Sequence, residues 1–247
     1  MVARVAKQAV VPDSQLDWRQ AFAWLPKIFM LTSIAALVVM GWMKMNDPQF
    51  LPIQKVRAQG AFINLTEAML LTRAGDIKGG YFNIDVRGVQ KNIESLAWVD
   101  KAYVKRTWPD TLVISVTEQN AVAAWQDNSL INVRGELFYP EKETFPAHLP
   151  QLNGPADSHQ QLLKLYRTTR SILSGTGLNI QQLEMDARRA MTIRLDNGLT
   201  ILLGRDAYIE RIERFVRVYA KVLMSEINSI QKIDMRYTNG FSITRQQ

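Results

Sequence analysis

The chain has 247 residues, 47% of them hydrophobic and 21% charged, and its formal net charge is +7 at pH 7. The basic residues are interspersed along the chain rather than clustered, which argues against a nucleic-acid-binding protein. The chain has no cysteine, so disulfide bonds, thiolate nucleophiles and cysteine-bound metals are excluded.

A long apolar segment lies near the N-terminus, behind a polar tail at residues 1–20. Residues 21–43 carry one charge, Lys27, and tryptophans lie near both ends of the segment. A helix needs about 20 mostly apolar residues to cross a bilayer, and tryptophans are typical of the interface. A cleaved secretory signal has a shorter apolar region, of about 7–15 residues, and a small-residue cleavage site that is missing here. The sequence predicts an uncleaved signal-anchor helix at residues 21–45.

The basic residues around this segment indicate its orientation. Four Lys or Arg residues lie at positions 4–27 and three lie at positions 44–57, and the side richer in them stays in the cytoplasm. A short tail ahead of the span and a large domain behind it is also the usual signal-anchor arrangement. We expect a cytoplasmic N-terminus and an exterior part formed by residues 46–247.

The first exterior unit is predicted at residues 46–119. Its pattern gives a strand at 51–60, helices at 67–73 and 86–96 capped by Thr66 and Asp85, and strands at 98–108 and 111–118. Two helices against a three-stranded sheet make a compact α+β unit. Trp98 and Trp108 are expected to pack the hairpin onto the helices, and Pro109 to set the turn.

The second unit, residues 120–247, reads as mainly antiparallel β structure with two helices. Short strands are predicted at 121–125, 130–133, 136–139, 178–185, 191–195, 199–203, 230–237 and 241–245. Helices are predicted at 157–173 and 207–225, and the proline-rich segment 140–155 is predicted to be a loop. The fold class is therefore α+β behind a single transmembrane helix.

No residue pattern indicates catalysis. His148 and His159 have no partner at metal-ligand spacing, and the exterior part has no nucleophile-elbow motif. Glu184 and Asp186 share one strand face but are followed by Arg188 and Arg189, which favours an exposed charged strand end over a carboxylate pair. We predict no catalytic residue, no metal site, no cofactor and no small-molecule substrate.

Several short motifs together resemble one known family. They are LAWV at 96–99, VKRTWPD at 104–110, LVISVTE at 112–118, AAW at 123–125, ARR at 187–189, LGR at 203–205 and IDMRY at 233–237. The first three resemble the end of a POTRA domain (β-α-α-β-β). The order of all seven motifs behind a single span resembles the FtsQ/DivIB family of bitopic bacterial cell-division proteins. This resemblance covers the whole chain from residue 21.

The resemblance implies a non-enzymatic scaffold in the inner membrane at the division septum, which recruits and holds the coiled-coil pair FtsB–FtsL and contacts other divisome proteins. Family members bind FtsB by strand addition along the last strand, with arginines that pair with acidic residues. The matching positions here are Arg188, Arg236, Tyr237, Asn239, Gly240 and Phe241. An exposed surface charge is the alternative interpretation of each arginine. Related chains carry an aromatic residue further along this strand, where Thr244 and Arg245 stand here.

Two other classes remain open. One is a POTRA-bearing protein of polypeptide translocation or outer-membrane assembly, but such chains usually continue into a membrane barrel of eight or more strands. The other is a membrane-anchored envelope enzyme, for which no catalytic motif is present.

Overall fold

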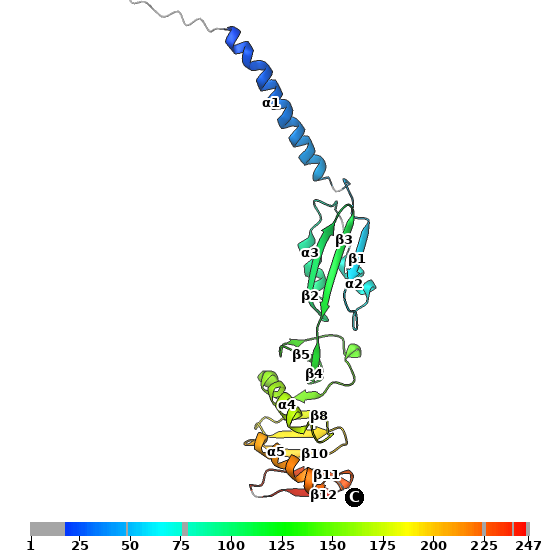
Figure 1. The fold of residues 1–247 in the computed structure, drawn as a ribbon, viewed down its shortest axis with the longest axis vertical. Helices are drawn as coiled ribbons and strands as arrows, with labels where there is room; N and C mark the ends of the chain where they lie inside the picture. Colours follow the sequence, from blue (N-terminus) through cyan, green and yellow to red (C-terminus); the bar gives the residue numbers. More distant parts are fainter. Residues whose placement is uncertain (1–17, 48, 76–78, 224–225, 239, 246–247) are drawn as a thin grey trace, which may run out of the picture.

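The computed structural model describes residues 18–47, 49–75, 79–223, 226–238 and 240–245. A long helix, a three-stranded sheet and a nine-stranded sheet follow one another along the long axis of the molecule (Figure 1). Most of the predicted tail at 1–20 and Asn239 lie outside the described residues.

The N-terminal helix α1 spans Trp18–Met45. Its segment Trp24–Met45 is the one stretch of the described residues that is long and apolar enough to cross a membrane. The most apolar part of this segment is not buried against the rest of the protein. The Nζ atom of Lys27 lies 5.1 Å from the ring centroid of Trp24, which suits a lysine that reaches from the helix toward the interface.

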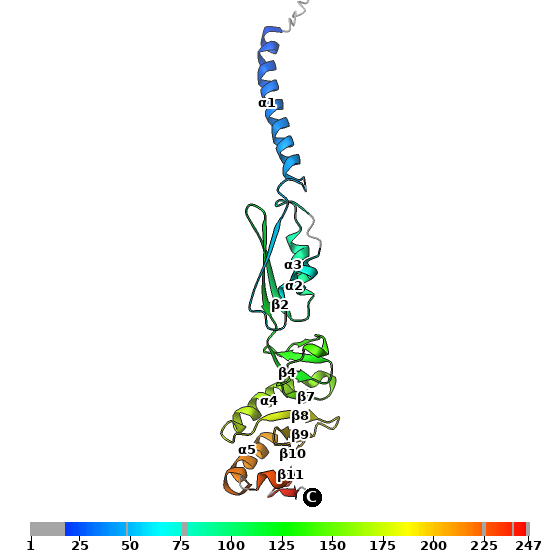
Figure 2. The same cartoon turned by 90° about the vertical axis from the view of Figure 1, so that its right-hand side faces the viewer.

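The three-stranded sheet has the order β1-β3-β2, with β1 parallel and β2 antiparallel to β3. Its elements are β1 (Lys55–Gln59), α2 (Glu67–Ala74), α3 (Val86–Glu94), β2 (Val99–Thr107) and β3 (Thr111–Glu118). Figure 2 shows both helices on one face of this sheet. The predicted caps are confirmed, because Thr66 accepts a hydrogen bond from the Met69 amide and Asp85 accepts one from the Gly88 amide.

The prediction that both tryptophans pack into the domain is wrong for Trp108. Trp98 is buried, but the Trp108 side chain is 72% exposed. Trp98 lies just before β2, where the sheet meets the second unit, whereas Trp108 lies in the turn that links β2 to β3, beyond the ends of both strands. The Trp108–Pro109 peptide bond is cis.

The nine-stranded sheet has the order β12-β11-β10-β9-β8-β7-β4-β5-β6. Its strands are β4 (Ala121–Trp125), β5 (Ser129–Asn132), β6 (Leu137–Phe138), β7 (Gln151–Asn153), β8 (Ile180–Met185), β9 (Met191–Leu195), β10 (Thr200–Gly204), β11 (Ile230–Asp234) and β12 (Ser242–Arg245). Helix α4 (His159–Leu173) links β7 to β8, and helix α5 (Tyr208–Val218), followed by a π-helical turn (Tyr219–Leu223), precedes β11.

Five of the eight strand pairings are antiparallel, so the predicted α+β class is confirmed. The β7–β8 and β10–β11 pairs are parallel because a helix carries the chain back across the sheet between them. One face of α4 is buried, with the spacing of a helix that packs on a sheet; its residues include Leu162, Leu165, Tyr166, Thr169 and Leu173.

The prediction of a loop throughout 140–155 is wrong. Its last part forms β7, which pairs in parallel with both β4 and β8 and buries Leu152 completely. Only four residues separate Pro150 from Pro155, too few to display a strand alternation. The strand depends on the neighbours that the tertiary fold supplies on each side.

The two sheets meet at a short joint, because β3 ends at Glu118 and β4 begins at Ala121. The Trp98 ring packs edge-on against Phe138 of β6, with the centroids 5.3 Å apart, and its Nε1 donates to Thr144 Oγ1 at 2.8 Å. Arg134, in the turn between β5 and β6, forms a bidentate ion pair with Asp100 of β2. Apolar and ionic contacts therefore cover the β6 edge of the larger sheet.

Candidate partner-binding site

Strand β12 forms the far edge of the nine-stranded sheet. It pairs with β11 on its inner side, and none of the described strands pairs with its outer side. All four of its side chains are exposed, including that of Ile243. An edge strand of this kind presents unpaired backbone amides and carbonyls that another chain can extend.

Strands β4, β7, β8, β10 and β11 all end at one border of the sheet, as their parallel pairings and the β8–β9–β10 hairpins require. Four exposed arginines follow the ends of these strands or lie in the turns there, and we call them the arginine rim: Arg188, Arg189, Arg205 and Arg236. Because β12 begins at this border, the rim and the open edge of β12 meet at the β11–β12 connection.

Arg236 is held in place by the acidic residue at the end of β11. Its Nε and Nη2 atoms donate to the Asp234 carboxylate at 2.6–3.0 Å. The bond from Arg236 holds the pKa of Asp234 below its usual range. The Arg236 side chain remains 59% exposed, and within the described residues Nη1 makes no hydrogen bond. Asp234 thus fixes one side of the guanidinium group, and the other side remains exposed.

Gly204 allows Arg236 to lie close to the sheet. A Cβ atom at this position would come within 3.2 Å of Arg236 Cγ and 2.9 Å of Arg211 Nη1, and the backbone φ is +74°. Both the close approach and the left-handed conformation favour glycine. The LGR motif at residues 203–205 therefore has a local physical role beside the rim.

The β11–β12 connection carries the predicted apolar anchors. Tyr237 is 57% exposed, while Phe241 is half-buried and packs against the core of the second unit. Gly240 lies between them in the chain and has open space around the position of a Cβ atom. Tyr237 is thus the side chain of this group that a partner can reach, whereas Phe241 secures the start of β12.

Arg214 of α5 also contacts this connection, although no sequence pattern indicated it. Its Nη1 donates to the Thr238 carbonyl at 2.6 Å, and its Nη2 donates to the carbonyls of Met235 and Tyr237, both at 2.8 Å. Three charge-assisted bonds therefore hold the connection that presents Tyr237. The sequence signal is weak, because Arg214 lies on a helix with Arg211 and Arg217 and looks like any other surface arginine.

Arg188 lies on the same border but apart from Arg236. It belongs to the β8–β9 turn, where Asp186 Oδ1 accepts bonds from the amides of Arg188 and Ala190 at 2.8 and 2.7 Å. Strands β9 and β10 stand between that turn and β11, so at about 4.8 Å per strand the two arginines are about 10–15 Å apart. The structure explains Asp186 as a turn-forming residue.

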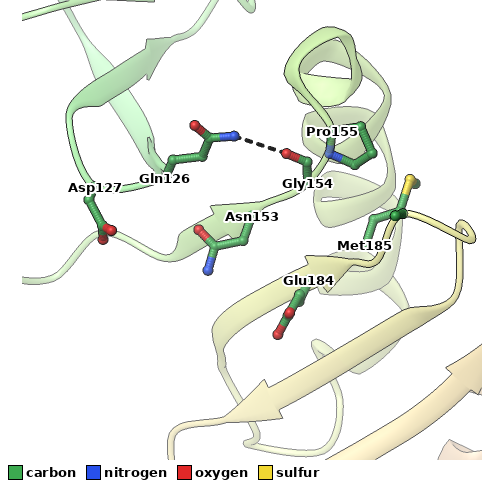
Figure 3. Close-up of a pocket in the computed structure, with 8 residues that line it drawn as sticks. Gln126, Asp127, Asn153, Gly154, Pro155, Glu184 and Met185 are labelled. Atoms are coloured by element: carbon green, nitrogen blue, oxygen red, sulfur yellow. Dashed lines mark hydrogen bonds between the residues drawn. The ribbon is translucent and has the colours of Figure 1, made fainter.

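A surface hollow lies at this border, and Ala187, the neighbour of Arg188 in the chain, is one of its lining residues. Figure 3 shows side chains that line it. Gln126 crosses it to donate to the Gly154 carbonyl at 2.9 Å. Asp127, Asn153 and Glu184 also line it, and its lining contains no histidine, lysine or serine, so the hollow holds neither a serine–histidine pair nor a lysine nucleophile. Among the described residues, no three His, Asp or Glu side chains come together as a metal site.

Comparisons with known proteins match the first sheet and the second sheet as far as Arg236. The family model "POTRA domain, FtsQ-type" matches residues 51–119, and the model "Cell division protein FtsQ/DivIB, C-terminal" matches residues 123–236. A protein of Coxiella burnetii named "Cell division protein FtsQ" is 32% identical over 221 residues, which cover 89% of this chain and 90% of that protein.

Proteins of the same name in two other bacteria are similar. The one from Xanthomonas campestris is 33% identical over 90% of this chain and 79% of its own length. The one from Vibrio cholerae is 32% identical over 81% of this chain and 77% of its own length.

Proposed function

Because the chain belongs to the FtsQ/DivIB family of cell-division proteins, we propose that it is a non-enzymatic scaffold of the division machinery. In this proposal it recruits and holds the coiled-coil pair FtsB–FtsL, and the contact is strand addition to β12. The observation that carries the proposal is the open β12 edge beside an exposed arginine rim. Family membership favours this division role over a role in polypeptide translocation.

Backbone groups and side chains have different roles in the proposed contact. The free amides and carbonyls of β12 supply affinity that depends little on sequence, and side chains supply selectivity. Tyr237 provides an apolar anchor, and Arg236 offers the free side of its guanidinium group to a partner carboxylate. Arg188 extends the positive surface along the rim and attracts an acidic partner at longer range.

The outer end of β12 is the weaker part of this interface. Arg245 Nη2 donates to Glu226 Oε2 at 2.7 Å, so its charge is already paired. Thr244, the neighbouring residue, offers little apolar area. We therefore place the centre of the contact between Tyr237 and Ile243, with Arg245 at its periphery.

We also propose the setting in which the scaffold works. Helix α1 anchors the chain in the inner membrane, the tail at 1–20 is cytoplasmic, and the rest lies in the periplasm at the septum. Residues 46–119 form the POTRA domain and residues 120–247 the partner-binding domain. The exposed apolar surface of α1 and the separate matches to two family models support this arrangement.

The test is a titration of the full chain, reconstituted in lipid nanodiscs, with an FtsB-derived segment. Tyr237→Ala should weaken binding by about 1–3 kcal/mol, the range for a buried aromatic anchor. Tyr139→Ala is the matched control, since Tyr139 is 63% exposed and follows β6 at the opposite edge of the sheet. It should leave the affinity unchanged.

Arg188→Glu in the same assay should weaken binding by slowing association, and added salt should reduce the difference. Thermal melts of each variant verify that the fold is intact. Equal affinity of wild type, Tyr237→Ala and Arg188→Glu at equal stability would contradict the proposed site.

A further inference from the structure

The end of the POTRA domain nearest α1 exposes aromatic side chains. Trp108 is 72% exposed, Phe50 is 41% exposed and Phe82 is 39% exposed. Trp108 occupies the tip of the β2–β3 hairpin, Phe82 the segment before α3, and Phe50 the segment between α1 and β1. Both views of the molecule place the hairpin tip at the end of the domain nearer α1 (Figures 1 and 2).

Hydrogen bonds tie this end of the domain to the end of α1. The amide of Asn46 donates to the Trp42 carbonyl at 3.1 Å, so Asn46 prolongs the last turn of the helix. Its own carbonyl accepts a bond from Asn83 Nδ2 at 3.0 Å. One residue beyond the helix, the chain is therefore already fastened to the loop that carries Phe82. If α1 crosses the bilayer, this loop lies at the bilayer surface.

The hairpin tip is fastened to the same loop. Arg106 Nη1 donates to the Phe82 carbonyl at 3.2 Å, and Nη2 donates to the Ile84 carbonyl at 3.0 Å. On the other side of the tip, the Asp110 carbonyl accepts a bond from the Gln54 amide at 2.9 Å. The segments carrying the three aromatic residues thus form one connected surface.

The charges at this end favour an anionic surface. Four basic residues, Lys44, Lys55, Lys105 and Arg106, and three acidic residues, Asp47, Asp85 and Asp110, lie in or beside these segments. Lys55 lies 3.9 Å from Asp110 and its side chain is 62% exposed. Basic residues close to a span are attracted to anionic headgroups, and tryptophan is enriched at headgroup depth.

We propose that this end of the POTRA domain, through Trp108, Phe50 and Phe82 and the surrounding lysines, docks into the headgroup layer of the bilayer that α1 crosses. Docking at a second point beside the helix fixes the tilt of the domain and hence the direction in which β12 is presented. The inference requires α1 to be a membrane span. It is independent of strand addition, because β12 lies at the opposite end of the molecule.

The test uses a spin label on the full chain, which has no native cysteine. Thr107→Cys places the label beside Trp108, and Thr117→Cys is the matched control. Both threonines are exposed residues of the same hairpin; six positions separate Thr117 from Thr111, the register partner of Thr107, or about 20 Å along the strand. The protein is reconstituted into phosphatidylcholine vesicles with and without phosphatidylglycerol, and collision of the label with oxygen and with a water-soluble nickel chelate is measured.

The proposal predicts that the label at 107 is more accessible to oxygen and less accessible to the nickel chelate than the label at 117. Phosphatidylglycerol should increase this difference. Adding Trp108→Ser should lower the ratio of oxygen accessibility to nickel-chelate accessibility at position 107 to the value measured at 117. An unchanged spectrum of the label at 117 would show that the fold is intact. Equal, water-like accessibility at both sites in both lipids would overturn the proposal, and so would protection at 107 that appears only when other division proteins are present.

Discussion

The two edges of the nine-stranded sheet differ in whether the rest of the protein packs against them. At one edge, β6 is two residues long, and Phe138 is buried against Trp98 of the POTRA domain while Arg134 binds Asp100. At the other edge, β12 is four residues long and every side chain is exposed. An uncovered edge invites pairing with another chain. The neighbouring POTRA domain thus packs against one edge, whereas the other edge is uncovered and is the one to which we propose that a partner strand is added.

The largest effect should follow from breaking the covered edge. Trp98→Ala removes the ring that packs on Phe138 and the bond to Thr144, and we expect a loss of about 3–5 kcal/mol in the free energy of unfolding, the range for a buried tryptophan. Denaturant unfolding of the full chain measures it. Partner affinity, measured under conditions where the variant is folded, should stay within about twofold of wild type, or ~0.4 kcal/mol. A loss of affinity as large as that of Tyr237→Ala would show that the two edges are coupled.

A smaller effect should follow from loosening the open edge. Arg214→Met removes three bonds to the carbonyls of the β11–β12 connection, and we expect a loss of about 2–3 kcal/mol in stability because bonds to charged groups are the stronger ones. Arg217→Met, an exposed arginine on the same helix, is the control and should be nearly neutral. Partner affinity should fall for Arg214→Met alone. If both variants bind as wild type does, the connection needs no support from α5.

The smallest effect concerns pH at the covered edge. The Arg134 guanidinium holds the pKa of Asp100 below its usual range, so the carboxylate stabilises the fold fully above its unfolded pKa of about 3.9. This stabilisation is lost as pH falls through the lower folded pKa. Wild type should therefore lose stability more steeply below about pH 4 than Asp100→Asn does. Thermal melts across pH 2–6 test this. If stability falls equally with pH in both proteins, the Asp100–Arg134 ion pair does not contribute to the acid sensitivity.

The sequence predicted the local elements better than the contacts between them. Caps such as Thr66 and Asp85 and the stripe of α4 are local patterns, so they could be read directly. Strand β7 could not, because its three residues become a strand only between β4 and β8. The burial of Trp98 against β6 likewise depends on where the second domain lies, whereas Trp108 is exposed because it lies in the hairpin turn beyond the ends of both strands.

The candidate site divides in the same way. The resemblance directed attention to the neighbours Arg236 and Tyr237, and the structure places both in the connection that leads to the open edge. The bond of Arg236 to Asp234 and the support from Arg214 link residues whose roles appear only in three dimensions. Arg188 is on the same border because two hairpins reverse the chain, which no local pattern specifies.

The proposed function requires that a partner strand pairs with β12. Amide hydrogen exchange of the full chain in nanodiscs, with and without the FtsB-derived segment, tests it most directly. Successive amides of an edge strand point alternately toward the sheet and away from it, so binding should slow exchange at alternate positions of Ser242–Arg245 and leave the amides of β6 unchanged. Unaltered exchange along β12 under saturating partner, with new protection at another strand, would contradict the account.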